Sequence, residues 1–443
     1  MTRLNKVSMR MLGLAIALHP SALPAAEIGF SESIAPILQE HCVACHGAKN
    51  AEGDYRIDSF SELIKPGDSE QLPIKAGDPL ASELLRRLTT ADASERMPAD
   101  SEPLSPQHIK LISDWITAGA AFDGADVTQM LSAVIPAPRY APPPEHYHAK
   151  IPITAVAFSS DGSQILTGGY HEIVAWNAID RKLVRRIQNI GQRVYSIATS
   201  QDGTLLAVAC GEPGRSGEVR LIDFATGEVK GVIGRATDVA LDVAFRPLSD
   251  ELAIASADQS IQVINHKTLD VVRKLSSHAD WVTAIAWSDD GKRLASASRD
   301  KSAKVFDMES GQMLATYQGH GAAVRGITFS PDAANVISVG TDNKLHRWNV
   351  QDANKIAEAA LGGEAYHLVR GQGFVLVPCA DRKLLKFDLA TNKIIQEFTG
   401  HDEWVLCVAL HPADSRIASG DFSGEVRLWD GDGSLIHNWL ASP

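Results

Sequence analysis

The 443-residue sequence has only five cysteines, no long basic run and no long apolar segment. Three of the cysteines, Cys210, Cys379 and Cys407, stand far apart in apolar stretches. Three thiols cannot all pair in disulfides, so we expect them to be small buried core residues. The absence of a Lys/Arg stripe argues against nucleic acid as a partner, because phosphate contacts need clustered positive charge.

No segment reaches the roughly 18 consecutive apolar residues that a membrane-spanning helix needs. A shorter apolar run, residues 11–18, follows a positively charged start and precedes small residues up to Ala26. This pattern is typical of an export signal. We therefore expect residues 1–26 to be a signal peptide, with the cut after Ala25 or Ala26 left open. The mature protein is expected to be periplasmic and not membrane-spanning.

Residues 42–46 read Cys-Val-Ala-Cys-His. Two thiols three residues apart can add to the two vinyl groups of one haem, and the following histidine is then an axial ligand of the iron. A zinc site would need a second pair of ligands at similar spacing, which the sequence lacks. A thioredoxin-like dithiol would need a strand–helix context. The motif therefore predicts one covalently bound haem c, held by Cys42, Cys45 and His46.

The second axial ligand is predicted by elimination. Met97 is the only methionine between the motif and the last predicted helix of this region, and it stands in a polar loop before Pro98. Methionine is normally a core residue, so its place in this loop favours a ligand role, with packing on the haem edge as the alternative. Competing ligands are His108 and His41, the latter too near the motif to reach the far side of the iron. His/Met ligation gives a raised reduction potential suited to electron transfer.

Three helices are predicted around the motif, one directly before it and one at the end of the region. They begin at Ser31, at Pro79 and at Pro106, and the last follows an N-cap at Ser105 and stops near Gly119. A helix before the haem motif and a helix at the end of the domain are what a c-type cytochrome packs together.

The region from residue 30 to residue 122 resembles the planctomycete-type cytochrome c domain. The matching residues are Ile34-Ala-Pro-Ile-Leu38, Cys42-Val-Ala-Cys-His-Gly47, Ala76-Gly-Asp-Pro79, Ser82-Glu-Leu-Leu85, Met97-Pro98 and Trp115-Ile-Thr-Ala-Gly-Ala120. The resemblance implies a monohaem domain with His/Met ligation. We expect this domain to span residues 27–125 and to be followed by a stiff, Pro-rich linker over residues 126–147.

Most of the formal net charge of −12 lies in the first region. Residues 27–123 contain 8 basic and 17 acidic side chains, a net charge of −9. An acidic carrier favours a basic redox partner and salt-dependent association. The alternative is a solvated acidic surface that only keeps the domain soluble.

From residue 148 to residue 443 the sequence repeats in steps of 40 to 47 residues. Each unit has an alternating strand, a polar turn, a small-residue strand and a further strand that ends in an aromatic or apolar residue. The recurring anchors are Phe158, Ala198, Phe245, Trp287, Phe329, Val369 and Leu410. Seven anchors predict a seven-bladed β-propeller, and an eighth blade would have to lie in the linker. Residues 434–440 are expected to be the fourth strand of the last blade, with the mode of ring closure left open.

The repeat resembles the WD-repeat family, in which a His, a Ser, an Asp and a Trp form hydrogen bonds within a blade. The fifth blade carries the full set at His320, Ser338, Asp342 and Trp348. The fourth has His278, Ser296 and Asp300, with Phe306 in place of Trp. The seventh has His401, Ser419 and Trp429, with Ser423 where the Asp is expected. Blades two and six diverge most.

These patterns predict a multidomain protein, in which a small all-α cytochrome c domain precedes an all-β seven-bladed WD40-type propeller. The periodic polar residues of the propeller are expected to be structural, because each blade stacks on its neighbours. The expected function is periplasmic electron transfer, with the propeller docking an unidentified protein partner, and not catalysis. Two alternatives stay open: a redox enzyme with a second cofactor or substrate in the propeller, and a haem-based sensor or assembly factor.

Overall fold

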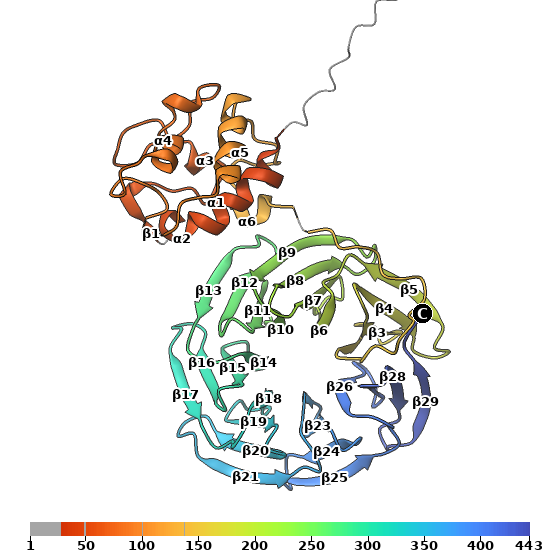
Figure 1. The fold of residues 1–443 in the computed structure, drawn as a ribbon. Helices are drawn as coiled ribbons and strands as arrows, with labels where there is room; N and C mark the ends of the chain where they lie inside the picture. The colour runs from red at the N-terminus through yellow and green to blue at the C-terminus, as the bar shows by residue number, and fades with distance from the viewer. Residues whose placement is uncertain (1–27, 48–49, 100, 137) are drawn as a thin grey trace, which may run out of the picture. The chain divides into compact units, whose positions relative to one another are not determined.

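The computed structural model describes residues 28–47, 50–99, 101–136 and 138–443, so the predicted signal peptide lies outside the described residues. The chain divides after Ile135 into two compact units. The first contains all the helices of the described residues and the second is built from strands (Figure 1). Within these residues no helix has both the length and the apolar character needed to cross a membrane.

The first unit packs short helices around one apolar core. Its elements are a π-helical turn Phe30–Ile34, α1 (Ala35–His41), α2 (Val43–His46), the short strand β1 (Asn50–Ala51), a 3-10 turn Glu52–Asp54, α3 (Phe60–Leu63), a 3-10 turn Pro79–Ala81, α4 (Glu83–Thr89), α5 (Pro106–Thr117) and α6 (Leu131–Val134). Phe30, Leu38 and Trp115 are buried in its centre, and the rings of Phe30 and Trp115 lie 5.4 Å apart. The helix before the motif and the helix that ends the domain therefore share one core.

The helix predicted from Ser105 is confirmed as α5. The Ser105 hydroxyl accepts a hydrogen bond from the His108 N–H at 3.1 Å, as an N-cap does. The helix ends at Thr117, and Gly119 then adopts a φ of +106° that favours glycine.

The helix predicted to begin at Pro79 is instead two elements. A 3-10 turn covers Pro79–Ala81, and α4 begins at Glu83. The break falls at Ser82, which is extended and buried. Its hydroxyl donates to Asp78 O and accepts from Lys75 N–H, both at 2.9 Å, and this local bonding competes with a continuous helix.

The segment predicted as a linker over residues 126–147 is divided between the two units. Leu131 is fully buried in the helical core, and its N–H donates to Asp58 O at 2.8 Å. Met130 forms an isolated antiparallel bridge with Ser59. Residues up to Ile135 therefore belong to the helical unit, because α6 completes its core.

The second unit contains seven sheets of four antiparallel strands, consecutive in the chain (Figure 1). Blade 1 holds β2 (Val156–Phe158), β3 (Gln164–Gly168), β4 (Glu172–Asn177) and β5 (Leu183–Gln188). Blade 2 holds β6 (Arg193–Thr199), β7 (Leu205–Glu212), β8 (Ser216–Asp223) and β9 (Val229–Ala236). Blade 3 holds β10 (Ala240–Phe245), β11 (Glu251–Ser256), β12 (Ile261–Asn265) and β13 (Val271–Leu275).

The other four blades repeat this order. Blade 4 holds β14 (Val282–Trp287), β15 (Arg293–Ser298), β16 (Ala303–Asp307) and β17 (Met313–Tyr317). Blade 5 holds β18 (Val324–Phe329), β19 (Asn335–Gly340), β20 (Lys344–Asn349) and β21 (Lys355–Ala360). Blade 6 holds β22 (Val369–Arg370), β23 (Phe374–Pro378), β24 (Leu384–Asp388) and β25 (Lys393–Phe398). Blade 7 holds β26 (Val405–Leu410), β27 (Ile417–Asp421), β28 (Glu425–Trp429) and β29 (Leu435–Leu440).

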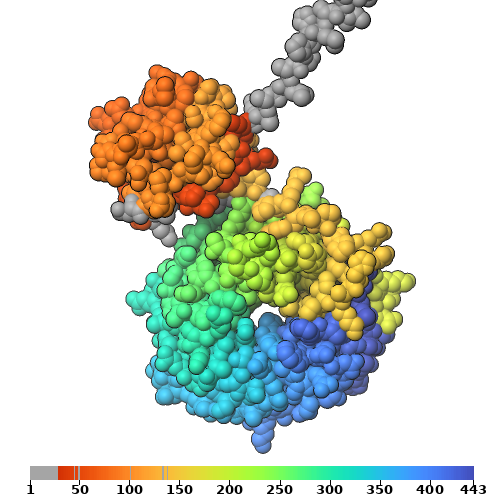
Figure 2. All heavy atoms as spheres, in the orientation of Figure 1, coloured from red at the N-terminus to blue at the C-terminus, as the bar shows by residue number. Residues whose placement is uncertain are grey.

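Blades 1 and 7 close the ring side by side without exchanging a strand. β29 pairs with β28 of its own blade, as expected for residues 434–440. The Ile153 N–H donates to Asp421 O at 3.1 Å, and the Cys407 thiol donates to Ile153 O at the same distance. The closed ring surrounds an opening that Figure 2 shows at its centre.

The cysteines outside the motif are buried core residues, as predicted. Cys210, Cys379 and Cys407 are free and lie on or beside the strands of blades 2, 6 and 7. Burial raises the pKa of each thiol, that of Cys210 to about 12, so all three are protonated at neutral pH. They therefore behave as small apolar side chains.

Residues 138–147 form a strap that is hydrogen-bonded to blades 1 and 2. In blade 2, Arg220 lies between Glu218 and the strap, 2.6 Å from Glu218 Oε1 and 2.6 Å from Pro138 O. The Tyr140 hydroxyl donates to the same carboxylate at 3.1 Å. The same arrangement recurs in blade 1. There Arg186 donates hydrogen bonds to Glu172 and to Pro144 O of the strap. The Tyr147 hydroxyl of the strap donates to Glu172. The prolines that predicted a stiff linker thus belong to a segment that is hydrogen-bonded to blades 1 and 2.

Candidate functional site

The Cys-x-x-Cys-His motif begins at Cys42, the residue between α1 and α2, and continues through the single turn of α2. α1 ends at His41, and the Cys42 carbonyl accepts hydrogen bonds from Cys45 N–H at 3.2 Å and from His46 N–H at 3.0 Å. This short turn brings Cys42, Cys45 and His46 to the wall of one cavity. Burial, with Cys45 nearby, raises the pKa of the Cys42 thiol to about 12. A redox-active dithiol needs a lowered thiol pKa, so the raised pKa of Cys42 argues against a thioredoxin-like role.

The imidazole of His46 is oriented by two backbone carbonyls. Its Nδ1 lies 3.0 Å from Glu52 O and 3.3 Å from Tyr55 O. Because both partners are acceptors, Nδ1 carries the ring proton and Nε2 keeps its lone pair. A metal-binding histidine is normally held in this way through its second nitrogen. The Tyr55 ring, 5.6 Å from His46, is itself fixed by a hydrogen bond from its hydroxyl to Leu63 O.

The cavity beside the motif has a volume of about 510 Å³. This volume lies within the roughly 300–1,000 Å³ of small-molecule and cofactor sites. Its wall includes His41, Cys42, Cys45, His46, Tyr55, Ile57, Leu84, Leu88, Met97 and Pro98. Two thiols, the His46 imidazole with no hydrogen bond to Nε2 from the described residues, a thioether and apolar side chains form a donor set that suits a haem. The residues present therefore fit the group that the motif implies.

Met97 lines the same cavity from the loop that follows α4. Its N–H donates to Arg87 O at 2.9 Å, and the side chain packs against the core of the unit. The loop is also held by Arg86, which pairs with Glu95 at 2.6 Å and with Glu83 at 2.7 Å. Hydrogen bonds from Arg86 and Arg87 lower the pKa of Glu83 to about 2. The polar residues around Met97 thus anchor the loop on α4.

The two competing histidines are placed differently. His41 lines the cavity next to Cys42, whereas His108 on α5 is not among the described residues of the cavity wall. Their rings lie 5.6 Å apart. Met97 and His46 therefore meet at one cavity while His108 stays outside it, and the ligand roles of Met97 and His46 remain predictions. Sequence reasoning missed Glu52 and Tyr55, because they act through backbone carbonyls that carry no side-chain signature.

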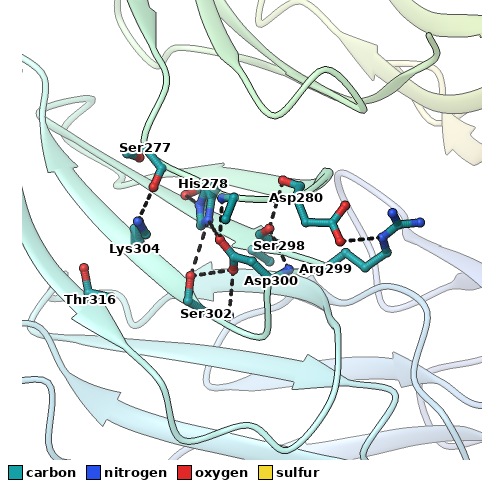
Figure 3. A network of polar contacts seen from close by, with 12 residues as sticks. Ser277, His278, Asp280, Ser298, Arg299, Asp300, Ser302, Lys304 and Thr316 are labelled. Carbon is teal, nitrogen blue, oxygen red and sulfur yellow. Dashed lines mark hydrogen bonds and ion pairs between the residues drawn. The ribbon is translucent and has the colours of Figure 1, made fainter.

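The polar network of blade 4 has the predicted members, of which Figure 3 labels His278 and Asp300. The His278 Nδ1 lies 2.8 Å from Asp300 Oδ2, and its Nε2 lies 2.7 Å from the Ser296 hydroxyl. Burial would raise the pKa of Asp300, but hydrogen bonds from Ser302, Ala279 N–H and His278 hold it well below its usual range. The carboxylate therefore stays ionised and joins the loop before β14 to the turn after β15.

Blades 5 and 7 contain complete networks, one of which corrects the sequence prediction. In blade 5 the expected set of His320, Ser338, Asp342 and Trp348 is hydrogen-bonded throughout. In blade 7 the partner of His401 is Asp421, at 2.9 Å, and not the residue at position 423. Ser423 instead donates to Asp421 at 2.8 Å. The carboxylate comes from the end of β27, two residues before the turn position used in blade 5.

Acid is expected to destabilise the propeller through His346 in blade 5. The His346 ring is fully buried against His320, with ring centroids 4.1 Å apart, and its Nδ1 lies 2.8 Å from the Tyr317 hydroxyl. Burial, assisted by His320 and Lys355, lowers the pKa of His346 to about 4. The folded state holds this ring neutral while the unfolded chain takes up a proton near pH 6.5. Stability is therefore complete above that pH and is lost progressively as the pH falls toward 4.

Unfolding by urea at several pH values between 4 and 7 measures this dependence. In His346→Gln the proton uptake on unfolding is expected to fall by on the order of one proton. The matched variant His148→Gln changes an exposed histidine. Its free energy of unfolding should depend on pH as that of the unmodified protein does. An equal pH dependence in His346→Gln and the unmodified protein would contradict this assignment.

Fold and cavity together define a small cytochrome c-type domain followed by a WD40-type propeller. Residues 42–101 match the family model "Planctomycete cytochrome C". The model "WD domain, G-beta repeat" matches residues 144–177, 269–307, 311–349 and 392–430. These matches cover the first three strands of blades 1, 4, 5 and 7, and the last three of them begin on the outer strand of the preceding blade. Blades 2, 3 and 6 have no match over their first three strands. The chain thus combines one domain of the first family with repeats of the second.

A curated relative is similar over a small part of the chain. An uncharacterized WD repeat-containing protein of Schizosaccharomyces pombe is 33% identical over 57 residues. The match covers 13% of this chain and 14% of that protein. The chain therefore spans only a small fraction of this relative, and the likeness concerns repeat sequence and not the whole molecule.

Proposed function

We propose that this protein is an exported, monohaem c-type cytochrome that transfers electrons, and that its propeller docks a protein partner. The observation that carries the proposal is the cavity that joins Cys42, Cys45, His46 and Met97. A bound haem c supplies a one-electron iron couple. The export signal predicted for residues 1–26 supports a periplasmic location.

The residues around the cavity have distinct tasks in this function. Cys42 and Cys45 would hold the macrocycle through thioether bonds, and His46 would bind the iron through Nε2. The carbonyls of Glu52 and Tyr55 keep the His46 proton on Nδ1, which raises the basicity of the ligand. Met97 would also hold the iron, through its thioether, and iron held by both residues would favour electron transfer over catalysis.

Charge supports a protein partner that is basic. The helical unit carries most of the net negative charge of the chain. Complementary charge mainly speeds association and selects the partner, and salt screens it. The polar networks of the propeller are used within its blades, as Figure 3 shows for His278 and Asp300 of blade 4.

Covalent attachment is tested by removing both thiols. In Cys42→Ala/Cys45→Ala, haem is expected to be absent from the polypeptide after denaturing electrophoresis, because no thioether bond can form. Each single variant should retain haem through one bond. Cys210→Ala, which alters a buried thiol of the propeller, is the matched control and should keep full staining. Haem that survives denaturation in the double variant would overturn the attachment site.

Iron analysis and reduced-minus-oxidised spectra of the full chain test the electron-carrier role. We expect one iron per chain, a reversible one-electron couple, and no carbon monoxide adduct at equilibrium while Met97 stays bound. A second redox cofactor would favour an enzyme instead. A reduced iron that binds carbon monoxide freely would favour a sensor.

A further inference from the structure

Three aromatic side chains gather where loops of blades 6 and 7 meet, before β22, before β26 and after β27. We call Tyr366, Trp404 and Phe422 the aromatic rim. Trp404 is 48% exposed and Phe422 is 50% exposed, and Tyr366 is half-buried. The Trp404 ring lies 5.8 Å from Phe422 and 6.3 Å from Tyr366, with the second pair stacked at 25°. Exposed clustered aromatic residues of this kind are enriched at the energetic centres of interfaces.

Backbone hydrogen bonds hold the aromatic rim in place. The Phe422 N–H donates to Trp404 O at 2.9 Å, so the turn after β27 is tied to the loop before β26. The Val405 N–H donates to Cys379 O at 3.2 Å, which joins that loop to blade 6. The Tyr366 N–H donates to Pro378 O at 3.4 Å. The aromatic rings are therefore presented from anchored loops, which lowers the entropy cost of binding.

The aromatic rim is flanked by carboxylates that lack counter-charges. Asp402 and Glu403 directly precede Trp404, are exposed, and form no ion pair with any residue that the structure describes. Glu364 lies in the loop before Tyr366 and reaches the Tyr366 hydroxyl at 3.4 Å. The cations of this region are Arg382, the largely buried Arg325, and Lys383 and Arg299, which pair with Glu397 and Asp280. Acidic groups outnumber basic ones around the aromatic rim.

Asp381 adds a carboxylate that has lost its usual partner. It lies in the turn after β23, the position that Asp342 occupies in the hydrogen-bonded network of blade 5. Blade 6 has Leu361 where blade 5 has His320, and Asp381 Oδ1 is buried without a hydrogen-bond partner. The side chain as a whole is half-buried, and Lys383, which pairs with Glu397, lies near enough to interact with its charge. Asp381 therefore adds one more carboxylate to the loops of blade 6.

We propose that the aromatic rim binds a basic segment of a partner protein, with an arginine or lysine side chain over the rings of Trp404 and Phe422. Aromatic faces attract cations, and nearby carboxylates strengthen that attraction. Arginine is favoured over lysine, because its planar guanidinium stacks on rings and pairs with carboxylates in two places. This inference rests on the proposed docking role of the propeller and names the surface and the chemistry of its partner.

Calorimetric titration of the full haem-loaded chain with the acetylated, amidated peptide (Gly-Ser-Arg)4 tests the proposal. Trp404→Ala/Phe422→Ala is expected to weaken binding by on the order of tenfold, the scale of an interface hot spot. Its control, Ile179→Ala/Leu248→Ala, removes two apolar side chains that are 77% and 82% exposed elsewhere on the propeller. That control should change the affinity less than about twofold.

Charge variants and matched peptides complete the test. Asp402→Asn/Glu403→Gln should weaken binding and reduce its salt dependence more than Asp270→Asn/Glu309→Gln, a control at exposed acidic positions. The peptide (Gly-Ser-Lys)4 should bind more weakly than the arginine peptide, and (Gly-Ser-Gln)4 weakest. All these substitutions lie in the propeller. Any binding of the peptides to the acidic helical unit should therefore contribute equally to every variant.

The outcomes separate this inference from the proposed function. Equal affinity of Trp404→Ala/Phe422→Ala and the unmodified protein overturns the inference, and an unchanged haem spectrum in the same sample then leaves the electron-carrier role standing. Absence of a haem spectrum overturns the electron-carrier role, whereas a loss of peptide binding confined to the aromatic-rim variants still supports the docking surface. Preference for (Gly-Ser-Gln)4 over the charged peptides contradicts the basic partner.

Discussion

Replacing Met97 by alanine in the haem-loaded protein is expected to remove the long-wavelength absorption band of a Met–Fe(III) bond. The reduction potential should fall by on the order of 100 mV, because a thioether ligand favours reduced iron and axial ligands move haem potentials over roughly 0.8 V. Met97 lines the same cavity as the motif. Its backbone N–H donates a hydrogen bond to Arg87 O, which holds the loop in place. Optical spectra and redox titration measure both effects.

The matched control is Met130→Ala in the same unit, since Met130 precedes α6 and is not among the described residues of the cavity wall. Its spectrum and potential should equal those of the unmodified protein. Met97→His should give a six-coordinate iron with a low potential and without the long-wavelength band. A spectrum unchanged by Met97→Ala would remove Met97 as the ligand.

Arg220→Ala is expected to lower the free energy of unfolding of the propeller by about 3–5 kcal/mol. The Arg220 side chain is fully buried and pairs with Glu218, which is 3% exposed. Its guanidinium also donates to Pro138 O and Asn189 O and lies 4.6 Å from the centre of the Tyr140 ring. Removal leaves a buried carboxylate without a counter-charge and releases the strap, and urea unfolding followed by tryptophan fluorescence measures the loss.

Two further variants test the cause of that loss. Glu228→Ala breaks an exposed ion pair with Lys230 in the same blade, and should change stability by about 0.5 kcal/mol or less. Arg220→Met/Glu218→Leu removes both buried charges and should recover much of the stability, because an apolar pair avoids the desolvation cost. A loss below about 1 kcal/mol in Arg220→Ala would mean that water already screens this pair.

The sequence predicted best where function depends on local spacing. Cys42, Cys45 and His46 are close in space because they lie within five consecutive residues. No tertiary information is therefore needed to group them. The blades were equally predictable, because a period of about 40 residues with alternating strands has few other folds. The boundary between the helical unit and the propeller was harder to predict. A high proline content predicts that a segment is stiff, but it does not indicate what that segment packs against.

The sequence by itself determined the haem-type motif, the candidate Met97 and the number of blades, because each is written in short-range pattern or in repetition. Only the tertiary structure decided which carbonyls orient His46, that Asp421 serves His401, and that the predicted linker is divided between the core around Leu131 and the strap. These features depend on backbone atoms and on segments distant in sequence. The three-dimensional path of the chain, and not residue type, sets those contacts.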